Sequence, residues 1–360
     1  TNNLLKIRNT ANSDWITLRG LDGSLTSSAD ASINSVSVGK GANSVAGNTV
    51  LGESALDASV SGGNNTAIGH SSLSANTSGT NNVAIGAGAA ILNTTGSNNV
   101  AIGKDALDAN TTASANIAIG TNALGVNTTG PQNNALGVNA LDANTTAGYN
   151  NAFGTNALSA NQTGQNNTAM GDSALAANTT AANNTGIGFE ALKVNTTGER
   201  NTAVGSLSAD AITTGNFNTA VGYNSLSATT TGSYNTSIGD TSLNANSTGE
   251  HNSALGQGAL QNNSTAESNT AIGSAALNQN TTGASNVGIG RNALTNNTTA
   301  SDNTAVGRDS LGVNTTGTSN VAVGAFAVDA NTTASNITGV GKNALSSNTT
   351  GESNNALGSH

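Results

Sequence analysis

Residues 99–115 read NVAIGKDALDANTTASA, and residues 116–132 repeat the pattern as NIAIGTNALGVNTTGPQ. Glycine occupies every seventeenth position from Gly52 to Gly358 without exception. A unit this short is too small to bury an apolar face alone, so it must stack on copies of itself. The repeat therefore predicts a solenoid rod and argues against a globular domain.

The residue types within each unit favour β-structure. Helical solenoid repeats need about 33–47 residues, and the recurring Asn, Thr and Gly are poor helix formers. Short apolar runs between Asn- and Gly-containing turns predict two short strands per coil. We therefore expect an all-β fold, a parallel β-roll or β-solenoid of 17-residue coils.

The recurring glycines, the Ile and Leu residues and the asparagines are each expected to have a structural role. We expect the glycines to adopt positive φ, the Ile and Leu side chains to stack in a dry interior, and the asparagines to form ladders along the axis. A ligand-binding role for the asparagines is the alternative. The representative residues are Gly86, Gly103, Gly120, Ile85, Ile102, Leu107, Leu124, Asn82, Asn99 and Asn110.

The expected core of a single chain is thin. Each coil supplies one Leu and one Ile-type side chain, aromatic residues make up 2% of the chain, and there is no cysteine. Files of Ala, Ser and Gly beside the apolar positions would let another backbone approach closely. We therefore expect a homotrimer, although the small residues could also serve only to fit a narrow coil.

Residues 34–47, NSVSVGKGANSVAG, resemble the 14-residue head repeat of YadA-type trimeric autotransporter adhesins. Residues 82–86 and 99–103 carry the same core, NVAIG. The resemblance implies a trimeric, left-handed parallel β-roll. The units depart from that repeat by their length and their Asn-Thr-Thr-Gly turns, and no binding residue transfers.

The chain divides into three parts. Residues 1–25 form an expected N-terminal β segment, residues 26–47 a transition with the YadA-like repeat, and residues 48–358 the solenoid. Residues 3–9 and 14–23 read as two strands and are similar to short segments of bacteriophage tail-fibre proteins. Trp15 is expected to be a small core or trimer anchor, with a sugar platform as the alternative.

Composition and motifs argue against several functions. The net charge is −9 without a basic patch, so nucleic-acid binding is not expected, and no apolar run is long enough to predict a membrane span. The histidines His70, His251 and His360 lie on different coils, and the aspartates at one shared position skip coils. We expect no enzyme, cofactor or metal site. Asn-x-Thr triplets such as residues 110–112 would be glycosylation acceptors only in a eukaryotic secretory pathway.

The leading functional hypothesis is the shaft of a phage tail fibre on the virion surface, extending a tip that binds a host receptor. The head or stalk of a bacterial trimeric adhesin at the cell surface is the alternative, and an ice-binding solenoid ranks third. Adjacent Thr128 and Thr129 would point opposite ways on a strand, whereas ice binders align their threonines. If the shaft contacts a glycan or protein receptor, Tyr223 and Tyr234 are the candidate contacts.

Overall fold

The computed structural model describes residues 6–8, 15–17, 30–58 and 60–359. Strands β1 (Lys6–Arg8) and β2 (Trp15–Thr17) form an antiparallel pair. The side chain of Trp15 lies outside the described residues, so its expected anchor role stays a prediction.

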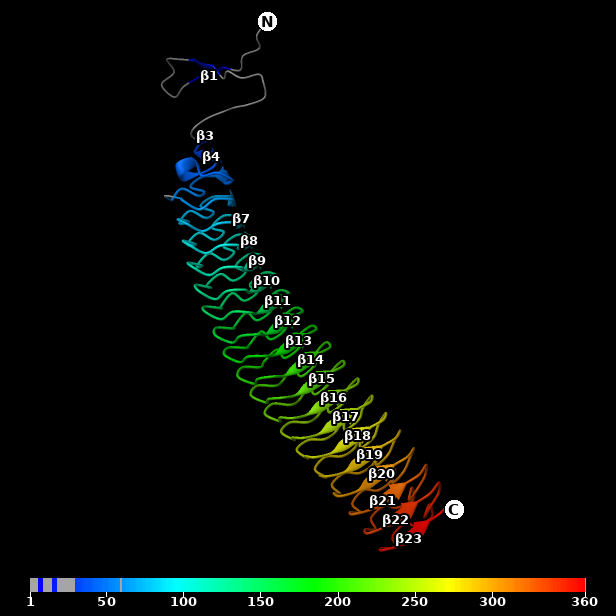
Figure 1. The fold of residues 1–360 in the computed structure, drawn as a ribbon. Coiled ribbons are helices and arrows are strands. Elements are labelled where there is room, and N and C mark those ends of the chain that lie inside the picture. Colours follow the sequence, from blue (N-terminus) through cyan, green and yellow to red (C-terminus); the bar gives the residue numbers. More distant parts are fainter. Residues whose placement is uncertain (1–5, 9–14, 18–29, 59, 360) are drawn as a thin grey trace.

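Residues 48–358 form a long, gently curved solenoid, with one strand in each coil (Figure 1). Within the described residues the strands of this stack are β5 (Thr49–Gly52), β6 (Thr66–Ile68), β7 (Val83–Ile85), β8 (Val100–Ile102), β9 (Ile117–Ile119), β10 (Asn134–Leu136), β11 (Asn151–Phe153), β12 (Thr168–Met170), β13 (Thr185–Ile187), β14 (Thr202–Val204), β15 (Thr219–Val221), β16 (Thr236–Ile238), β17 (Ser253–Leu255), β18 (Thr270–Ile272), β19 (Val287–Ile289), β20 (Thr304–Val306), β21 (Val321–Val323), β22 (Thr338–Val340) and β23 (Asn355–Leu357).

Neighbouring coils pair in parallel with a register of one repeat unit. Val100 pairs with Ile117 and Ile102 with Ile119, and the same offset recurs along the stack. The parallel β-solenoid expected from the sequence is confirmed. The expectation of two strands per coil was wrong: each coil has one strand, which spans three residues from β6 onward, and the rest consists of turns. The leucine segment is a turn because its backbone alternates in the sign of φ.

The interior is lined by leucine and alanine. Leu107 and Leu124 are fully buried, as expected. On each strand the middle residue points inward, so Ala84 and Ala101 are buried. The prediction that Ile85 and Ile102 lie in the interior was wrong, because both flank that alanine and therefore point outward, with Ile85 36% exposed.

The leucines adopt a backbone conformation that the sequence did not predict. Leu107 has φ 55° and Leu124 φ 52°, in the left-handed region. That conformation costs a residue with a Cβ roughly 1–2 kcal/mol. Burying a leucine side chain contributes about 1.5–3 kcal/mol, so interior packing offsets the strain.

From Gly69 onward the recurring glycines adopt positive φ, as expected. Gly86 and Gly103 have φ 138° and Gly120 φ 135°. A Cβ on Gly103 would meet the backbone carbonyl of Gly120 in the next coil. Left-handed geometry and close approach of the next coil therefore both require glycine here.

Two buried files of asparagine run along the axis. In the first, the side-chain oxygen of Asn82 accepts a hydrogen bond from the backbone N–H of Asn99 at 2.9 Å, and Asn82 Nδ2 donates to Gly96 O at 2.9 Å. In the second, Asn110 Nδ2 donates to Asn93 Oδ1 at 2.7 Å and to Ala113 O at 3.0 Å. The expected ladders are confirmed, and they satisfy turn backbone groups that would otherwise be buried without partners.

An antiparallel cap covers the first coil. Strands β3 (Ala31–Ile33) and β4 (Val36–Gly39) form a hairpin, and β4 pairs antiparallel with β5. A short 3-10 turn, η1 (Ala42–Ser44), follows, and Ala42 N donates to Leu56 O. The stretch that resembles an adhesin repeat, residues 34–47, thus forms much of this cap.

Candidate binding surfaces

The described residues show no constellation typical of a metal site. No three His, Cys, Asp or Glu side chains among them gather closely enough to hold a metal ion. Within the same residues, no helix is long and apolar enough to cross a membrane. The candidate sites are therefore clefts and surface files.

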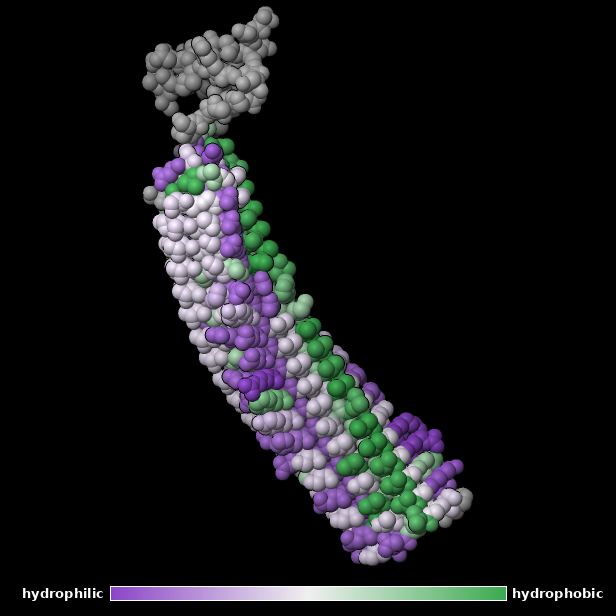
Figure 2. Space-filling view, viewed as in Figure 1, coloured by the Kyte–Doolittle hydropathy of each residue, from purple (hydrophilic) through white to green (hydrophobic). Residues whose placement is uncertain are grey.

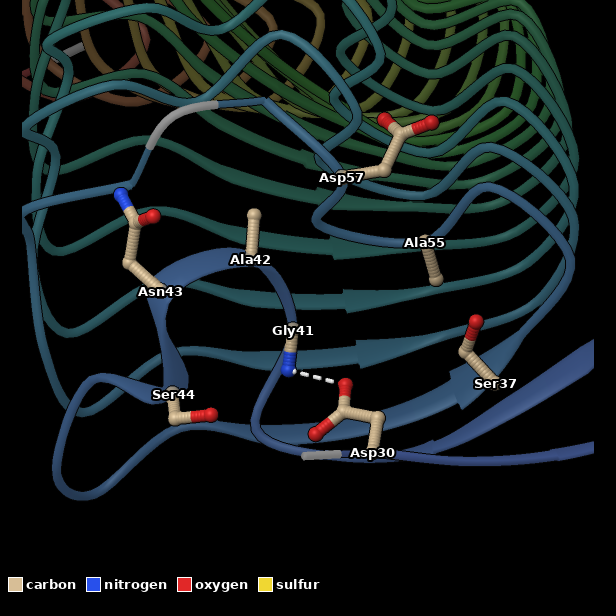
Figure 3. Close-up of a pocket in the computed structure, with 8 residues that line it drawn as sticks. All are labelled: Asp30, Ser37, Gly41, Ala42, Asn43, Ser44, Ala55 and Asp57. Carbon is tan, nitrogen blue, oxygen red and sulfur yellow. Dashed lines mark hydrogen bonds between the residues drawn. The ribbon is translucent and has the colours of Figure 1, made fainter. Parts of the chain in front are cut away.

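One cleft lies between the cap and the first coil and has a volume of about 310 Å³ (Figure 3). It is lined by Asp30, Ser37, Gly41, Ala42, Asn43, Ser44, Ala55 and Asp57. The Asp30 carboxylate accepts hydrogen bonds from the backbone N–H groups of Lys40 at 2.7 Å and Gly41 at 2.6 Å. Asp30 thus fixes the turn after β4, which is a structural role.

A second cleft, of about 230 Å³, lies near the C-terminal end of the stack. Asp309 faces it and lies 3.5 Å from Arg308 and 4.0 Å from Arg291. Burial, and secondarily the Asp309 charge, raise the pKa of the Asp329 carboxyl, whose Oδ1 has no hydrogen-bond partner among the described residues. The two guanidinium groups already neutralise Asp309, so the cleft does not form a concentrated anionic site.

Asp329 belongs to a file of aspartates five residues after the recurring glycine. Burial is the main cause that raises the pKa of the Asp108, Asp142 and Asp210 carboxyls as well. These aspartates skip coils and do not form a stacked row, as the sequence indicates. Burial of these carboxylates destabilises the fold, and their arrangement indicates no catalytic or metal-binding role.

The most extensive surface feature is an apolar file on the outer face of the sheet. Figure 2 shows it as a green stripe running along the length of the solenoid. It consists of the residue before each recurring glycine, which is the last strand residue from β6 onward, and the most exposed members are Leu51, Ile85, Leu136, Phe153, Met170, Ile238, Leu255, Ile272 and Leu357. We call this set the outer apolar file. Thr or Val commonly occupies the other outward position of the strand, two residues earlier.

Aromatic side chains form a second, shorter feature. Phe217, Tyr234 and His251 occupy equivalent positions in three consecutive coils and stack with nearly parallel rings. Arg200, one coil earlier, places its guanidinium carbon 5.2 Å from the Phe217 ring centroid. In the sequence these residues look like isolated side chains, although their spacing of one repeat unit is the signal that predicts the stack.

The two candidate receptor contacts do not form one site. Tyr223 follows β15 by two residues, whereas Tyr234 precedes β16 by two residues. Because β15 and β16 are parallel neighbours, the two tyrosines lie at opposite ends of the strands. Tyr234 belongs to the aromatic stack and Tyr223 does not.

The asparagines assigned structural roles are engaged within the fold. Asn82 and Asn99 are each 1% exposed and Asn110 is fully buried, with hydrogen bonds to neighbouring coils. Their amides are not available to a ligand on the surface. For the same reason the Asn110 triplet cannot accept a glycan on the folded chain.

Comparison with known proteins gives no match, either to a family model, to a curated protein or to a solved structure. The surfaces of the chain are therefore what indicates its function.

Proposed function

We propose that this chain is the shaft of a homotrimeric fibre, as in a bacteriophage tail fibre, and that it holds a receptor-binding tip away from the virion. The observation that carries the proposal is the outer apolar file. An exposed apolar surface that runs along a whole molecule is typical of a site that another macromolecule covers. The proposed role is mechanical and non-enzymatic.

The area of this face suits a lateral contact between long chains. Strands β5 to β23, about 4.8 Å apart, give a face roughly 90 Å long. With a width of about 10 Å, the face could bury on the order of 900 Å² per chain, which matches a stable protein interface. A contact along the entire rod would also compensate for the thin core of each coil.

The resemblances in sequence support three chains and a fibre. Residues 34–47 resemble the repeat of a trimeric adhesin family, and residues 3–9 and 14–23 are similar to segments of phage tail fibres. Together these favour the tail-fibre shaft on a virion.

A bacterial trimeric autotransporter adhesin is the alternative, with the chain as its head or stalk at the cell surface. The NVAIG cores at residues 82–86 and 99–103 favour it. A four-stranded outer-membrane anchor encoded downstream in the same gene would establish the adhesin and exclude the tail fibre. A position among phage structural genes would do the reverse.

Ice binding remains the third hypothesis. The Thr128 hydroxyl donates to Thr145 O at 3.0 Å, and Thr111 donates to Thr128 O at 3.2 Å. Because these hydroxyls are used between coils, they are poorly placed to order water in an ice lattice. Thermal hysteresis of the purified protein would favour ice binding over a shaft.

Sedimentation equilibrium tests the assembly. The expected mass of the full chain is three times 34.9 kDa. Replacing the file in five consecutive coils by threonine (Ile85, Ile102, Ile119, Leu136 and Phe153) is expected to raise the dissociation constant at least tenfold.

A matched control carries five exposed turn threonines replaced by serine (Thr95, Thr112, Thr129, Thr146 and Thr163) and should stay trimeric. A wild-type chain that is monomeric at high protein concentration would overturn the proposal. If the dissociation constant of the trimer does not change on the five threonine substitutions, the interface lies on another face of the solenoid.

Receptor contact by Tyr223 or Tyr234 is tested separately on a glycan array. Loss of binding on Tyr223→Ser or Tyr234→Ser would support the shaft as a receptor-binding element. Unchanged binding of both variants would assign recognition to another part of the fibre.

A further inference from the structure

One column of the surface lies two residues before each strand and holds Asn or Ser in many coils. In four consecutive coils it holds Arg200, Phe217, Tyr234 and His251. The ring centroids of Phe217 and Tyr234 are 5.0 Å apart with planes at 5° to one another, and those of Tyr234 and His251 are 4.9 Å apart at 3°. We call these four residues the planar ladder.

The ladder presents ring edges to solvent. Each inner ring face is covered by the next ring, and the outer face of Phe217 is covered by the Arg200 guanidinium. Phe217 is nevertheless 40% exposed and Tyr234 51% exposed. The exposed surface is therefore a row of parallel edges, spaced by the coil repeat.

A row of ring edges selects a particular partner chemistry. A flat aromatic ligand can lie across this row and make van der Waals contact with successive ring edges. A sugar would stack its C–H groups on a ring face, and both faces of Phe217 and of Tyr234 are occupied. The ladder therefore favours a flat aromatic ligand over a carbohydrate.

Charge beside the ladder favours a cation. Glu199 directly precedes Arg200, and Glu250 directly precedes His251. Glu267 holds the same position in the next coil, before Ser268. Glu199 and Glu267 are exposed and Glu250 is half-buried. These three carboxylates outnumber the one permanent cation of the ladder, Arg200, on a chain of net charge −9.

We propose that the planar ladder binds an elongated, flat aromatic cation whose long axis lies parallel to the solenoid. The four positions span three coil steps, roughly 14 Å at about 4.8 Å per step, which fits a ligand of two or three linked rings. The proposal does not rest on the proposed fibre function.

The chain supplies its own controls. Tyr149 occupies the same column, but its neighbours along the axis are Gln132 and Asn166. Tyr223 is as exposed as Tyr234 but lies at the other end of the strands. Serine occurs naturally in the ladder column at Ser268 and Ser285, so replacing a ladder ring by serine should preserve the coil.

Thioflavin T, a flat aromatic cation, is the probe. Titration of the full chain is expected to show saturable fluorescence enhancement, reduced at least fivefold in Phe217→Ser/Tyr234→Ser. Tyr149→Ser/Tyr223→Ser should change it less than 1.5-fold. Glu250→Gln/Glu267→Gln should weaken binding about threefold and reduce its salt dependence.

Circular dichroism and thermal melting of every variant establish that the solenoid is intact. Equal enhancement in the two double-serine variants would place the dye elsewhere, for example on the outer apolar file, and would overturn the proposal. Absence of saturable binding by the folded wild-type chain would overturn it as well.

Discussion

At the scale of single residues, the fold depends on positions where the backbone conformation or an unpaired backbone group requires one residue type. From Gly69 onward the recurring glycine permits a positive φ and close approach of the next coil, and the asparagines satisfy buried turn groups. Each of these demands predicts the effect of a substitution.

Gly103→Ala is expected to destabilise the chain by about 2–4 kcal/mol, because a Cβ is disfavoured at φ 138° and would meet Gly120. Urea unfolding followed by circular dichroism measures the change. Gly186→Ala is the control, since Ala169 and Ala203 occupy the equivalent positions on both sides. That control should change the free energy of unfolding by less than about 1 kcal/mol. Equal effects of the two substitutions would contradict the role of φ.

Asn110→Ala is expected to cost roughly 2–4 kcal/mol. It leaves Asn93 Oδ1 without its donor and Ala113 O with Asn99 Nδ2 as its one remaining side-chain donor, and it removes one of the two acceptors of Asn127 Nδ2. Asn296→Ala is the control, since this side chain is exposed and Ala109 and Ala143 occupy the equivalent position in other coils; it should change stability by less than about 0.5 kcal/mol. Chemical denaturation of both variants tests the comparison, and a neutral Asn110→Ala would exclude a stabilising ladder.

Asp142→Asn is expected to stabilise the chain at pH 7. Burial raises the pKa of the Asp142 carboxyl in the folded state, so the folded state holds this proton more tightly than the unfolded chain. The favourable contribution is complete below the unfolded pKa, about 3.9, and is lost as pH rises through the folded pKa.

We expect a rise in Tm of roughly 1–2 °C at pH 7 and no difference near pH 3. Asparagine already occupies this position at Asn244 and Asn278, so the coil accepts it. Melting curves at the two pH values provide the measurement, and a loss of stability at pH 7 would contradict the desolvation argument.

At the scale of elements, the antiparallel cap distinguishes the first coil from all later ones. Strand β4 pairs with β5 in the antiparallel sense, whereas β5 onward pair in parallel. The cap thus covers the edge of β5 that would otherwise present unpaired N–H and C=O groups.

Deleting residues 1–47 is expected to expose that edge and to cause concentration-dependent association. Light scattering across a dilution series should show particles larger than those of the full chain under the same conditions. Identical particle sizes for the two chains would show that the cap does not protect the edge.

At the scale of the whole molecule, stability is shared between neighbouring coils, because each coil contacts only the adjacent ones. Interactions recur at an offset of one repeat unit along the stack. The length of the rod should therefore vary in whole coils without loss of the fold.

Deletion of residues 138–154 removes one unit and is expected to give a folded rod about 4.8 Å shorter. Deletion of residues 138–155 removes one residue more, so every later glycine and asparagine is out of register with the coils before it. Small-angle scattering and thermal melting should show a cooperative rod for the first deletion and a large loss of stability for the second. Equal behaviour would contradict a register set by the repeat unit.

The sequence alone determined the coil, its period and its ladders, because Gly103 and Asn110 meet demands of the local backbone that recur in every unit. Only the tertiary structure decided which side chains face inward. Ile102 was expected in the interior, but strand geometry buries the neighbouring Ala101, and the narrow lumen is already filled by the leucines. The cap also depended on tertiary pairing, since residues 34–47 resemble a repeat yet pair antiparallel with β5. Local periodicity specifies a coil, whereas the direction of each side chain depends on how coils close and stack.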